Sequence, residues 1–430
     1  MGRGPVTSAV RRLYTLLLYL TLPWVSLLVA VRGLRNPGYW HGWQDRFGFG
    51  PAGAPGGIWV HAVSVGEVQA AAVLIDALRA RMPASVITLS CATPTARARG
   101  RALLPGLDVR YAPYDLPGSV RRCLRSLAPR MLIVLETELW PNLLHQAQRA
   151  GVPVLIASAR VSERSTRIYR RLPGLLRAAL AADVWVGAQT DTDARRFATL
   201  GVPAARLCVV GNLKFDRALP PELMARGRQL RARYAAGRPV WAAGSTHAGE
   251  EQIVLDAHTR LLAQLPRALL ILAPRHPQRF TAAAASVAAH GFHCRQRSAD
   301  PAAGDYQVLL LDTLGELSDF YAAADVAFVG GSLTPVGGHN LLEPAALGLP
   351  VLAGPHNFNS PEVARALGRQ GALTIVHDAA ELAAALARLL ADQEARTRQG
   401  AAGRAAIDAN RGALERLLGL IDQLPARNAA

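Results

Sequence analysis

Residues 58–67 read Ile-Trp-Val-His-Ala-Val-Ser-Val-Gly-Glu: a short apolar run, a turn of small residues and the start of a helical pattern that continues over 68–81. An uncharged run of this length, bounded by turn residues, is typical of a strand that is buried on both faces. Because a helix follows it directly, the stretch predicts a strand–turn–helix unit. Repetition of this unit along the chain would give an α/β fold with a parallel sheet.

The same pattern recurs in two series, which are separated by residues 217–239, a segment rich in Arg that contains Pro220 and Pro221. The strands predicted for the first series lie at 58–63, 85–90, 131–135, 154–157, 184–188 and 207–210, and those of the second at 240–243, 268–272, 307–311, 326–329 and 350–352. Residues 139–150 have helical spacing like 68–81. We therefore predict two Rossmann-like halves that face a cleft, with ligand sites at the carboxyl ends of their strands.

The amino-acid composition limits the kinds of partner that the protein is expected to bind. The 430 residues allow two or three domains, and 48 basic against 31 acidic residues give a net charge of +17. This charge suits an anionic partner: a nucleic acid, an acidic membrane face or a phosphorylated substrate. The four cysteines lie far apart without a C-x-x-C pair, which argues against a disulfide framework and a thiolate zinc site.

An N-terminal segment predicts membrane association. Residues 13–31 are 19 residues without a charge, interrupted only by Pro23, and as a helix they would cover about 28 Å. No A-x-A cleavage site follows, which favours a retained anchor at 1–35 over a signal peptide, with a buried core helix as the alternative. Arginines flank the run on both sides, so the sequence leaves open whether it spans the bilayer or lies in one leaflet.

Two glycine-containing loops of the second half follow predicted strands. Residues 330–340 open a helix predicted at 341–347. The glycines let a phosphate approach the backbone, and the free N–H groups of the helix start bind the anion. Asn340 and Glu343 have the N-x-x-E spacing of a capping box, but such a carboxylate can equally reach a ribose hydroxyl. Residues 314–316, Leu-Gly-Glu, form either a second ligand loop or a simple turn before a helix.

Arg275 stands between Pro274 and His276-Pro277 at another strand end. Prolines stiffen the loop that presents this arginine, which favours a role in holding a phosphate or a base edge over that of a solvated charge. Gly244-Ser-Thr-His247 also follows a strand, with Glu250 and Glu251 in the next helical turn.

The first half places carboxylates at strand ends. Glu67 starts a helix, where the helix dipole alone would favour it by roughly 0.3–1 kcal/mol, or where it could face the cleft. Glu136 and Glu138 end another strand, and two carboxylates there have no evident packing use. Residues 191–193, Asp-Thr-Asp, match the D-x-D of metal-dependent sugar transferases, but their position before a helix favours N-capping.

Five blocks together resemble the transferases of 3-deoxy-D-manno-octulosonic acid (Kdo) in lipopolysaccharide biosynthesis. They are H-A-V-S-V-G-E at 61–67, E-T-E-L-W-P-N at 136–142, N-L-K-F-D at 212–216, P-R-H-P at 274–277 and G-G-H-N-L-L-E-P-A-A-L-G at 337–348. The resemblance implies an inverting, metal-independent glycosyltransferase of the GT-B type that moves Kdo from CMP-Kdo to the lipid A precursor lipid IVA. It also implies attachment to the cytoplasmic face of the inner membrane.

The resemblance assigns roles to residues. Glu67 would accept the proton, and Glu136 and Lys214 would stabilise the transition state. The residues that would hold CMP are Pro274, Arg275, Leu314, Gly315, Glu316, Asn340, Leu341, Leu342 and Glu343. Leu314 departs from the methionine that is frequent in the family, which a backbone contact would tolerate. No metal and no cofactor is expected, because a CMP-linked sugar leaves with one phosphate that arginine, lysine and a helix start can neutralise.

The rest of the sequence agrees with these expectations. Lys214 is one lysine beside 47 arginines, so it is either required as a compact point charge or is left over in an arginine-biased gene. Surplus arginines suit an acceptor with phosphates, and six of them lie between 160 and 177.

The predicted domains are an anchor at 1–35, an acceptor domain at 36–216, a linker at 217–239 and a CMP-sugar-binding domain at 240–430. The alternative enzyme is another membrane-associated GT-B transferase that uses a nucleotide diphosphate sugar on a lipid. A nucleic-acid binder is not expected, because clustered aromatics for base stacking are lacking.

Overall fold

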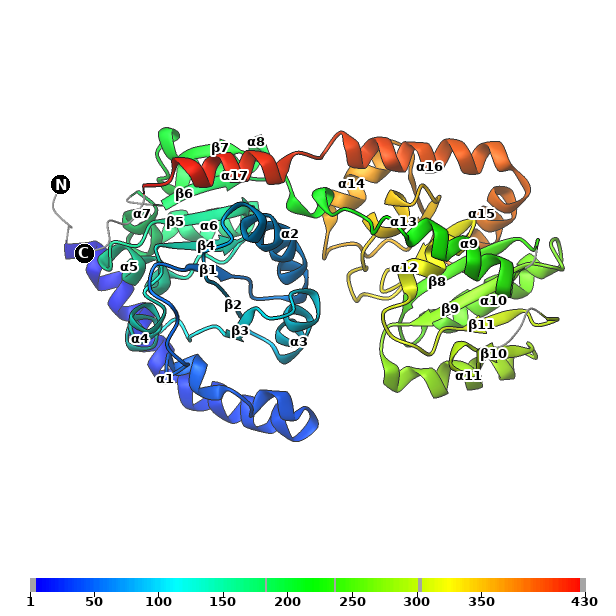
Figure 1. Cartoon of the computed structure of the whole chain (residues 1–430), viewed down its shortest axis with the longest axis horizontal. Coiled ribbons are helices and arrows are strands. Elements are labelled where there is room, and N and C mark those ends of the chain that lie inside the picture. Colours follow the sequence, from blue (N-terminus) through cyan, green and yellow to red (C-terminus); the bar gives the residue numbers. More distant parts are fainter. Residues whose placement is uncertain (1–4, 182–183, 236, 301–303, 426–430) are drawn as a thin grey trace. The chain divides into compact units, whose positions relative to one another are not determined.

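The computed structural model describes residues 5–181, 184–235, 237–300 and 304–425 (Figure 1). The chain forms two compact units, and each is an α/β layer structure with one parallel sheet. The first unit comprises Met1–Arg217 and Arg411–Ala430, and the second comprises Ala218–Asn410.

Seven parallel strands form the sheet of the first unit, in the order β3-β2-β1-β4-β5-β6-β7. The strands are β1 Ile58–His61, β2 Ile87–Cys91, β3 Asp108–Tyr111, β4 Met131–Leu135, β5 Val154–Ala159, β6 Val184–Ala188 and β7 Leu207–Val209. Strand order reverses between β1 and β4, so the unit has the doubly wound topology predicted for it. Residues 58–67 form β1, in the middle of this sheet, and the start of the helix that follows it.

Helices cover both faces of this sheet (Figure 1). Side chains of β1 and β4 alternate between two apolar cores, one completed by α2, α3 and α17 and the other by α4, α5, α7 and α8. The helices are α2 Val65–Arg81, α3 Pro94–Leu103, α4 Pro117–Leu127, α5 Pro141–Arg149, α6 Glu163–Arg171, α7 Pro173–Leu180, α8 Asp191–Leu200 and α17 Ala413–Gln423, with short 3-10 turns η1 Pro37–Tyr39, η2 Trp43–Phe47, η3 Ala204–Arg206 and η4 Leu213–Asp216. Burial on both faces explains why the central strands are continuously apolar.

The N-terminal segment forms one long helix, α1 Pro5–Arg35, of which Ala9–Leu34 is long and apolar enough to cross a membrane. It also contacts the body of the first unit: Tyr14 Oη donates to Asp115 Oδ2 over 2.9 Å, and Asn142 Nδ2 donates to Thr15 Oγ1 over 3.1 Å. Apart from Tyr19, the large apolar side chains of α1 that remain exposed recur mostly at intervals of three and four: Leu13, Leu16, Leu17, Leu20, Trp24, Leu27, Leu28, Val31 and Leu34. The helix therefore has a polar attachment to the body and an uncovered apolar stripe.

The second unit repeats the architecture. Its sheet has the order β10-β11-β9-β8-β12-β13-β14, all parallel, and reverses between β8 and β12. Its strands are β8 Val240–Thr246, β9 Leu269–Pro274, β10 Cys294–Gln296, β11 Val308–Leu310, β12 Val326–Val329, β13 Val351–Ala353 and β14 Leu373–Ile375. Its helices are α9 Leu223–Tyr234, α10 Glu250–Leu262, α11 Phe280–Ala289, α12 Leu317–Ala323, α13 Leu342–Ala346, α14 Pro361–Arg369, α15 Ala379–Ala391 and α16 Gln393–Asp408, with η5 Pro277–Arg279 and η6 Arg297–Ala299.

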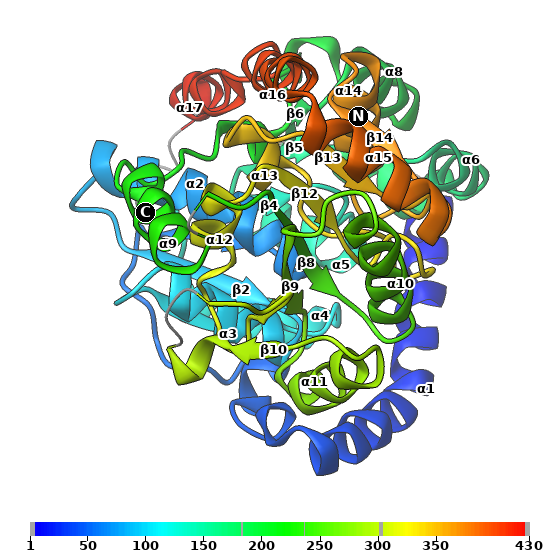
Figure 2. The ribbon, with the colours of Figure 1, turned by 90° about the vertical axis from the view of Figure 1, so that its right-hand side faces the viewer.

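Two predicted boundaries differ from the structure. The segment 217–239, predicted as a linker, contains α9, which packs on α12 within the second unit (Figure 2). The arginines of this segment favoured a linker in the prediction, but Arg231 and Arg226 form ion pairs with Asp325 and Asp319 of the same unit. The second domain does not run to residue 430 either, because α17 completes a core of the first unit.

Candidate active site

The carboxyl ends of β1 and β4, at the reversal point of the first sheet, carry the predicted acidic residues. Glu67 lies in the first turn of α2. Its backbone N–H donates to the hydroxyl of the N-cap residue Ser64, and its carboxylate accepts a hydrogen bond from the same hydroxyl. Glu67 Oε2 also accepts the Val63 N–H at 2.7 Å. This capping box fixes the carboxylate, and the residue is 7% exposed.

Glu136 ends β4 with φ +53°, in the left-handed region that residues other than glycine rarely adopt. The carboxylate is buried between two cations: Lys214 Nζ lies 2.7 Å from Oε1, and Arg160 Nε lies 3.1 Å from Oε2. A backbone conformation that costs about 1–3 kcal/mol persists only where the surroundings impose it, and such residues are frequent at functional sites. The structure thus brings two of the predicted catalytic residues, Glu136 and Lys214, into direct contact.

A third carboxylate, Glu138, follows two residues later. Trp140 Nε1 donates to Glu138 Oε2 at 2.6 Å, and the Trp140 ring packs edge-on against His61, the last residue of β1. Burial and the charge of Glu136 raise the pKa of Glu138, while the Trp140 hydrogen bond opposes them. Glu136 and Glu138, for which the sequence offered no packing role, therefore have different partners. Glu136 binds two cations, and Glu138 binds an indole N–H.

Among these carboxylates, Glu67 has the clearest features of a proton acceptor. Burial raises its pKa to about 7, and the negative charges of Glu138 and Glu136 act in the same direction. The hydrogen bonds from Val63 and Ser64 oppose the shift without cancelling it. Glu136 is instead neutralised by its two cations. A carboxyl group that titrates near neutral pH can accept and release a proton under physiological conditions, which is what a general base needs.

The N-L-K-F-D block explains how Lys214 reaches this site. Asn212 Oδ1 caps the η4 turn by accepting the Lys214 N–H at 3.0 Å, and Leu213 and Phe215 are buried. Asp216 accepts the N–H groups of Gly412 and Leu414, both at 2.7 Å. Four residues of the block therefore build and fasten the turn, and Lys214 is the one that presents a charge to Glu136.

The D-x-D stretch has the capping role that its position favours. Thr190 is the N-cap of α8 and accepts the Asp193 N–H at 3.1 Å, while Asp193 Oδ1 accepts the Val161 N–H at 3.1 Å. Thr190 thus N-caps α8, and the Asp193 side chain is bound to a backbone N–H, so the interpretation of 191–193 as a metal motif is not needed.

In the second unit, the predicted nucleotide residues lie at the carboxyl edge of the sheet. Pro274 ends β9, and Arg275 is exposed, with its backbone N–H bonded to the Thr246 carbonyl of β8 at 3.0 Å. Gly315, with φ +89°, makes the turn before α12, and Leu314 is exposed at its tip. Glu316 Oε1 accepts from Arg297 Nη2 at 2.8 Å. Strand-end loops thus present an arginine and a carboxylate at the same edge.

The glycine loop after β12 is held by a buried carboxylate near its beginning, before the helix start at which the sequence predicts anion binding. Its N–H groups at Gly331, Ser332 and Leu333 are bound to the buried carboxylate of Glu250, at 2.6–2.9 Å. Glu250 also accepts the His247 N–H at 3.1 Å. The sequence places Glu250 in the first turn of a helix, but it does not reveal that this carboxylate satisfies the loop. These N–H groups therefore hold the loop in shape.

The helix that follows this loop is shorter than predicted. α13 Leu342–Ala346 has five residues, against 341–347 in the prediction. Asn340 Oδ1 accepts the Leu342 N–H at 3.1 Å, while Glu343 Oε1 is hydrogen bonded by Ser318 of α12. The Glu343 carboxylate is thus oriented by another helix, which differs from the reciprocal contact of a capping box.

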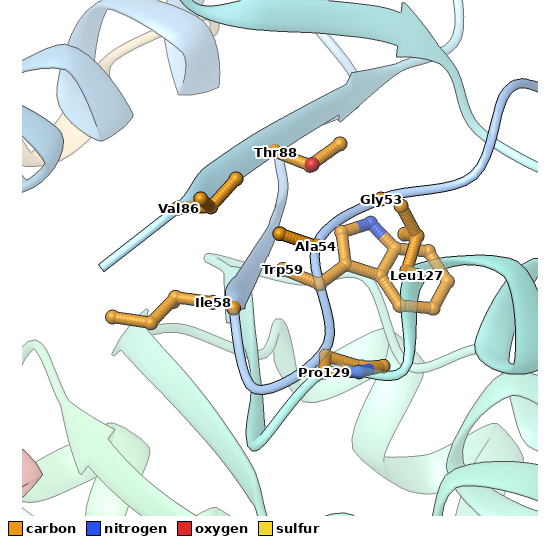
Figure 3. Close-up of a pocket in the computed structure, with 9 residues that line it drawn as sticks. Gly53, Ala54, Ile58, Trp59, Val86, Thr88, Leu127 and Pro129 are labelled. Carbon is orange, nitrogen blue, oxygen red and sulfur yellow. The ribbon is translucent and has the colours of Figure 1, made fainter. Parts of the chain in front are cut away.

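A small pocket lies away from these residues (Figure 3). Its walls include Ile58, Trp59, Val86, Leu127 and Pro129, at the amino-terminal ends of β1, β2 and β4. Ligand sites of doubly wound sheets lie at the opposite, carboxyl edge. This pocket is therefore not part of the candidate site.

The comparisons with known proteins match both units. Residues 41–217 match the family model described as 3-deoxy-D-manno-octulosonic-acid transferase (kdotransferase), and residues 297–406 match glycosyl transferases group 1. A 3-deoxy-D-manno-octulosonic acid transferase of Haemophilus influenzae is 40% identical over 424 residues, which cover 97% of this chain and 99% of that protein. One of Bordetella pertussis is 41% identical over 439 residues, covering 98% and 99%.

The chain belongs to the Kdo transferase family.

As a Kdo transferase it is a glycosyltransferase, as the five blocks predict. The fold has relatives of another activity: the UDP-GlcNAc 2-epimerase of Neisseria meningitidis bound to UDP-GlcNAc superposes with a TM-score of 0.57 at 14% identity, covering 85% of this chain and 99% of that one. At this identity the likeness concerns the fold alone. Together with the two doubly wound sheets and the transferase family models, it gives the Kdo transferase the GT-B type fold predicted for it.

Proposed function

We propose that this Kdo transferase moves Kdo from CMP-Kdo to a hydroxyl group of the lipid A precursor lipid IVA, with inversion at the anomeric carbon. The observation that carries the proposal is the division of labour among the carboxylates of the first unit. Glu67 is bound by neutral donors and has a pKa near 7, whereas Glu136 is paired with Lys214 and Arg160. One group is thus suited to take a proton and the other to hold cations.

In the proposed reaction, the acceptor hydroxyl attacks the anomeric carbon of Kdo as the bond to the CMP phosphate oxygen breaks. The hydroxyl proton passes to a Glu67 carboxylate oxygen, and CMP leaves with the electron pair of the broken bond. A base in this role contributes about 10²–10⁴-fold to the rate. Lys214, held at 2.7 Å from Glu136, is proposed to stabilise the negative charge of the leaving phosphate or of the Kdo carboxylate.

The second unit is proposed to hold the nucleotide. Arg275 supplies a guanidinium for the phosphate, and the loops at Leu314–Glu316 and Asn340–Glu343 supply polar contacts for the nucleoside. Glu343 and Glu316 are both hydrogen bonded by neighbouring side chains, which supports defined positions for carboxylates that could bind ribose hydroxyls. No step in this assignment uses a metal ion or a cofactor.

We also propose that α1 attaches the enzyme to the cytoplasmic face of the inner membrane, where the lipid acceptor resides. The apolar stripe of α1 supports contact with lipid, and its hydrogen bonds from Tyr14 and to Thr15 tie it to the globular body. A helix held in this way is better suited to lie in the interface than to span the bilayer. A cysteine introduced as Gly2→Cys should then react with an impermeant maleimide from the same side of the membrane as the body; reaction from the opposite side would show a spanning helix.

The experiment that tests the activity is mass spectrometry of lipid IVA after incubation with CMP-Kdo and the full chain. Addition of Kdo is expected with the wild-type enzyme and not with Glu67→Gln, and proton NMR of the product reports the anomeric configuration. A parallel incubation with a uridine diphosphate sugar tests the alternative donor. A product only in that second incubation, or a retained configuration, would contradict the proposal.

A further inference from the structure

Three histidines of the second unit meet at the carboxyl edge of its sheet, and the proposed function gives none of them a role. His247 follows β8, His276 follows Arg275 at the end of β9, and His339 lies in the loop after β12. The rings of His247 and His339 are stacked, with centroids 5.0 Å apart and planes within 5°. The His276 ring stands edge-on to His247 with centroids at 5.3 Å.

The shortest contact in the cluster limits the protonation of two of its imidazoles. His247 Nε2 and His339 Nε2 are 2.8 Å apart, a hydrogen bond in which one nitrogen donates and the other accepts. At least one of the two imidazoles is therefore neutral. A zinc ion needs about 2.0–2.1 Å to each nitrogen, so the directly bonded pair leaves no room for a metal between these two atoms.

The surroundings keep the imidazoles neutral. Burial lowers the pKa of His339 to about 3, and partial desolvation lowers the pKa of the half-buried His247 and of the exposed His276. The positive charge of Arg275 adds to the effect at each of them. Arg279, which pairs with Glu251, acts on His247 in the same direction. Glu250 opposes these charges at His247, but its carboxylate is already bound to four backbone N–H groups.

The loops are shaped around this cluster. Gly331 has φ +70°, and a Cβ atom there would lie 2.9 Å from the His339 ring, so only glycine admits the imidazole. Ser245, two residues before His247, has φ +58°, a strained conformation at the end of β8. The bond from the Arg275 N–H to the Thr246 carbonyl ties the β9 loop to this strand end. Strain and a required glycine at one point indicate that the arrangement is held in place.

We propose that His247, His276 and His339, together with Arg275, form an anion-binding subsite for the nucleotide sugar, and that the cluster takes up a proton when the anion binds. This inference rests on the donor proposed above, whose phosphate and carboxylate share the required chemistry. The anion offsets the charge of Arg275 and makes the imidazolium favourable. α13 has only five residues, so its helix dipole contributes little positive potential at its N-terminus. The histidines supply the positive charge that the start of a longer helix would provide.

Isothermal titration of CMP into the full-length enzyme tests the proton directly. The titration is run at pH 7.5 in two buffers that differ in ionisation enthalpy. At this pH CMP is nearly fully dianionic, because the second pKa of its phosphate is about 6. If binding restores the pKa of one imidazole to about 7, roughly a quarter of a proton is taken up per CMP. Free Kdo in place of CMP identifies the carboxylate as the anion if it alone gives the uptake. No uptake with either probe would overturn the inference.

Variants then assign the proton. Glutamine matches the position of Nε2 without gaining a charge, so His247→Gln and His339→Gln should each bind CMP about tenfold more weakly and lose the uptake. The affinity for cytidine, followed by NMR, should be unchanged, which separates loss of the anion subsite from loss of folding. His293→Gln, on an exposed residue before β10 at the opposite edge of the sheet, is the matched control. Uptake that persists in both variants would contradict the assignment. Normal Kdo transfer without any uptake would refute this inference alone, and absence of CMP binding would refute the donor instead.

Discussion

The two units place different kinds of titratable side chain at the same topological position, carboxylates in the first and imidazoles in the second. At the reversal of the first sheet, three carboxylates gather, and two cations neutralise one of them, Glu136. At the reversal of the second sheet, three imidazoles and Arg275 gather, and the Glu250 carboxylate is consumed by backbone N–H groups.

The difference shows how one scaffold serves two tasks. Burial acts on both sites, but it raises the pKa of Glu67 and lowers that of His339, because it penalises the charged form in each case. In our proposal the first site accepts a proton from a hydroxyl group, and the second accepts an anion. The chemistry therefore follows from which residues end the strands, rather than from the fold.

The largest expected effect is that of Glu67→Gln. Removal of the base should lower kcat by about 10²–10⁴-fold, while CMP binds with unchanged affinity because the second unit is untouched. The transfer rate and a CMP titration are measured on the same preparation. Turnover near the wild-type rate would move the role of base to another group, with Glu138 the first to examine.

Lys214→Arg should follow in size. The charge is preserved, but a planar guanidinium cannot reproduce an ammonium group 2.7 Å from Glu136 Oε1, so we expect kcat to fall by about 10–100-fold. CMP affinity serves as the internal control. A variant with the wild-type rate would show that the lone lysine reflects composition.

Arg275→Ala tests the second unit. Loss of a charge-assisted hydrogen bond to a phosphate is worth about 1.5–3 kcal/mol, so CMP and CMP-Kdo should both bind about 10–150-fold more weakly. Arg295→Ala, on the exposed edge strand β10, is the matched control and should leave both affinities unchanged. If Arg275→Ala lowers kcat without weakening CMP, this arginine does not hold the phosphate.

The smallest effect concerns pH. Glu67 must be ionised to accept a proton, so kcat/KM should rise with pH through an apparent pKa of about 7. Glu138→Gln removes a negative charge that raises this pKa, and the acidic limb should move to lower pH by up to about one unit. Glu163→Gln, which removes an exposed carboxylate on α6, should leave it in place. An unmoved limb in Glu138→Gln would mean that the charge of Glu138 does not contribute to the pKa of Glu67.

The sequence predicted the central strands well because they carry a continuous apolar signal. Residues 131–135, 184–188 and 326–329 coincide with β4, β6 and β12. The strands that it missed, β3, β10 and β14, all lie at the edges of their sheets. An edge strand is short and partly solvated, so residues such as those of Cys294–Gln296 have no apolar run to detect.

Within the candidate site, the positions that could be predicted from strand and helix patterns are those at the ends of strands. Glu136 and Arg275 stand directly after apolar runs and Glu67 begins the helix that follows one, and the structure puts each at a carboxyl edge. The partners could not be read from the chain, because Lys214 lies 78 positions after Glu136 in the sequence, and Glu250 binds a loop that is 81–83 positions away. Nor could the sequence show that this distant carboxylate occupies the first N–H groups of the glycine loop, at Gly331, Ser332 and Leu333.

The return of the chain to the first unit has a consequence for biosynthesis. α17 contributes Leu417 and Ile421 to a core that α2 and β1 also form, and Asp216 accepts N–H groups at its start. The ribosome makes α17 only after the whole second unit, which at 5–20 residues per second delays it by about ten seconds or more. During that interval the core side chains of the first unit that α17 contacts remain uncovered. The nascent enzyme should therefore depend on a chaperone until its last helix emerges.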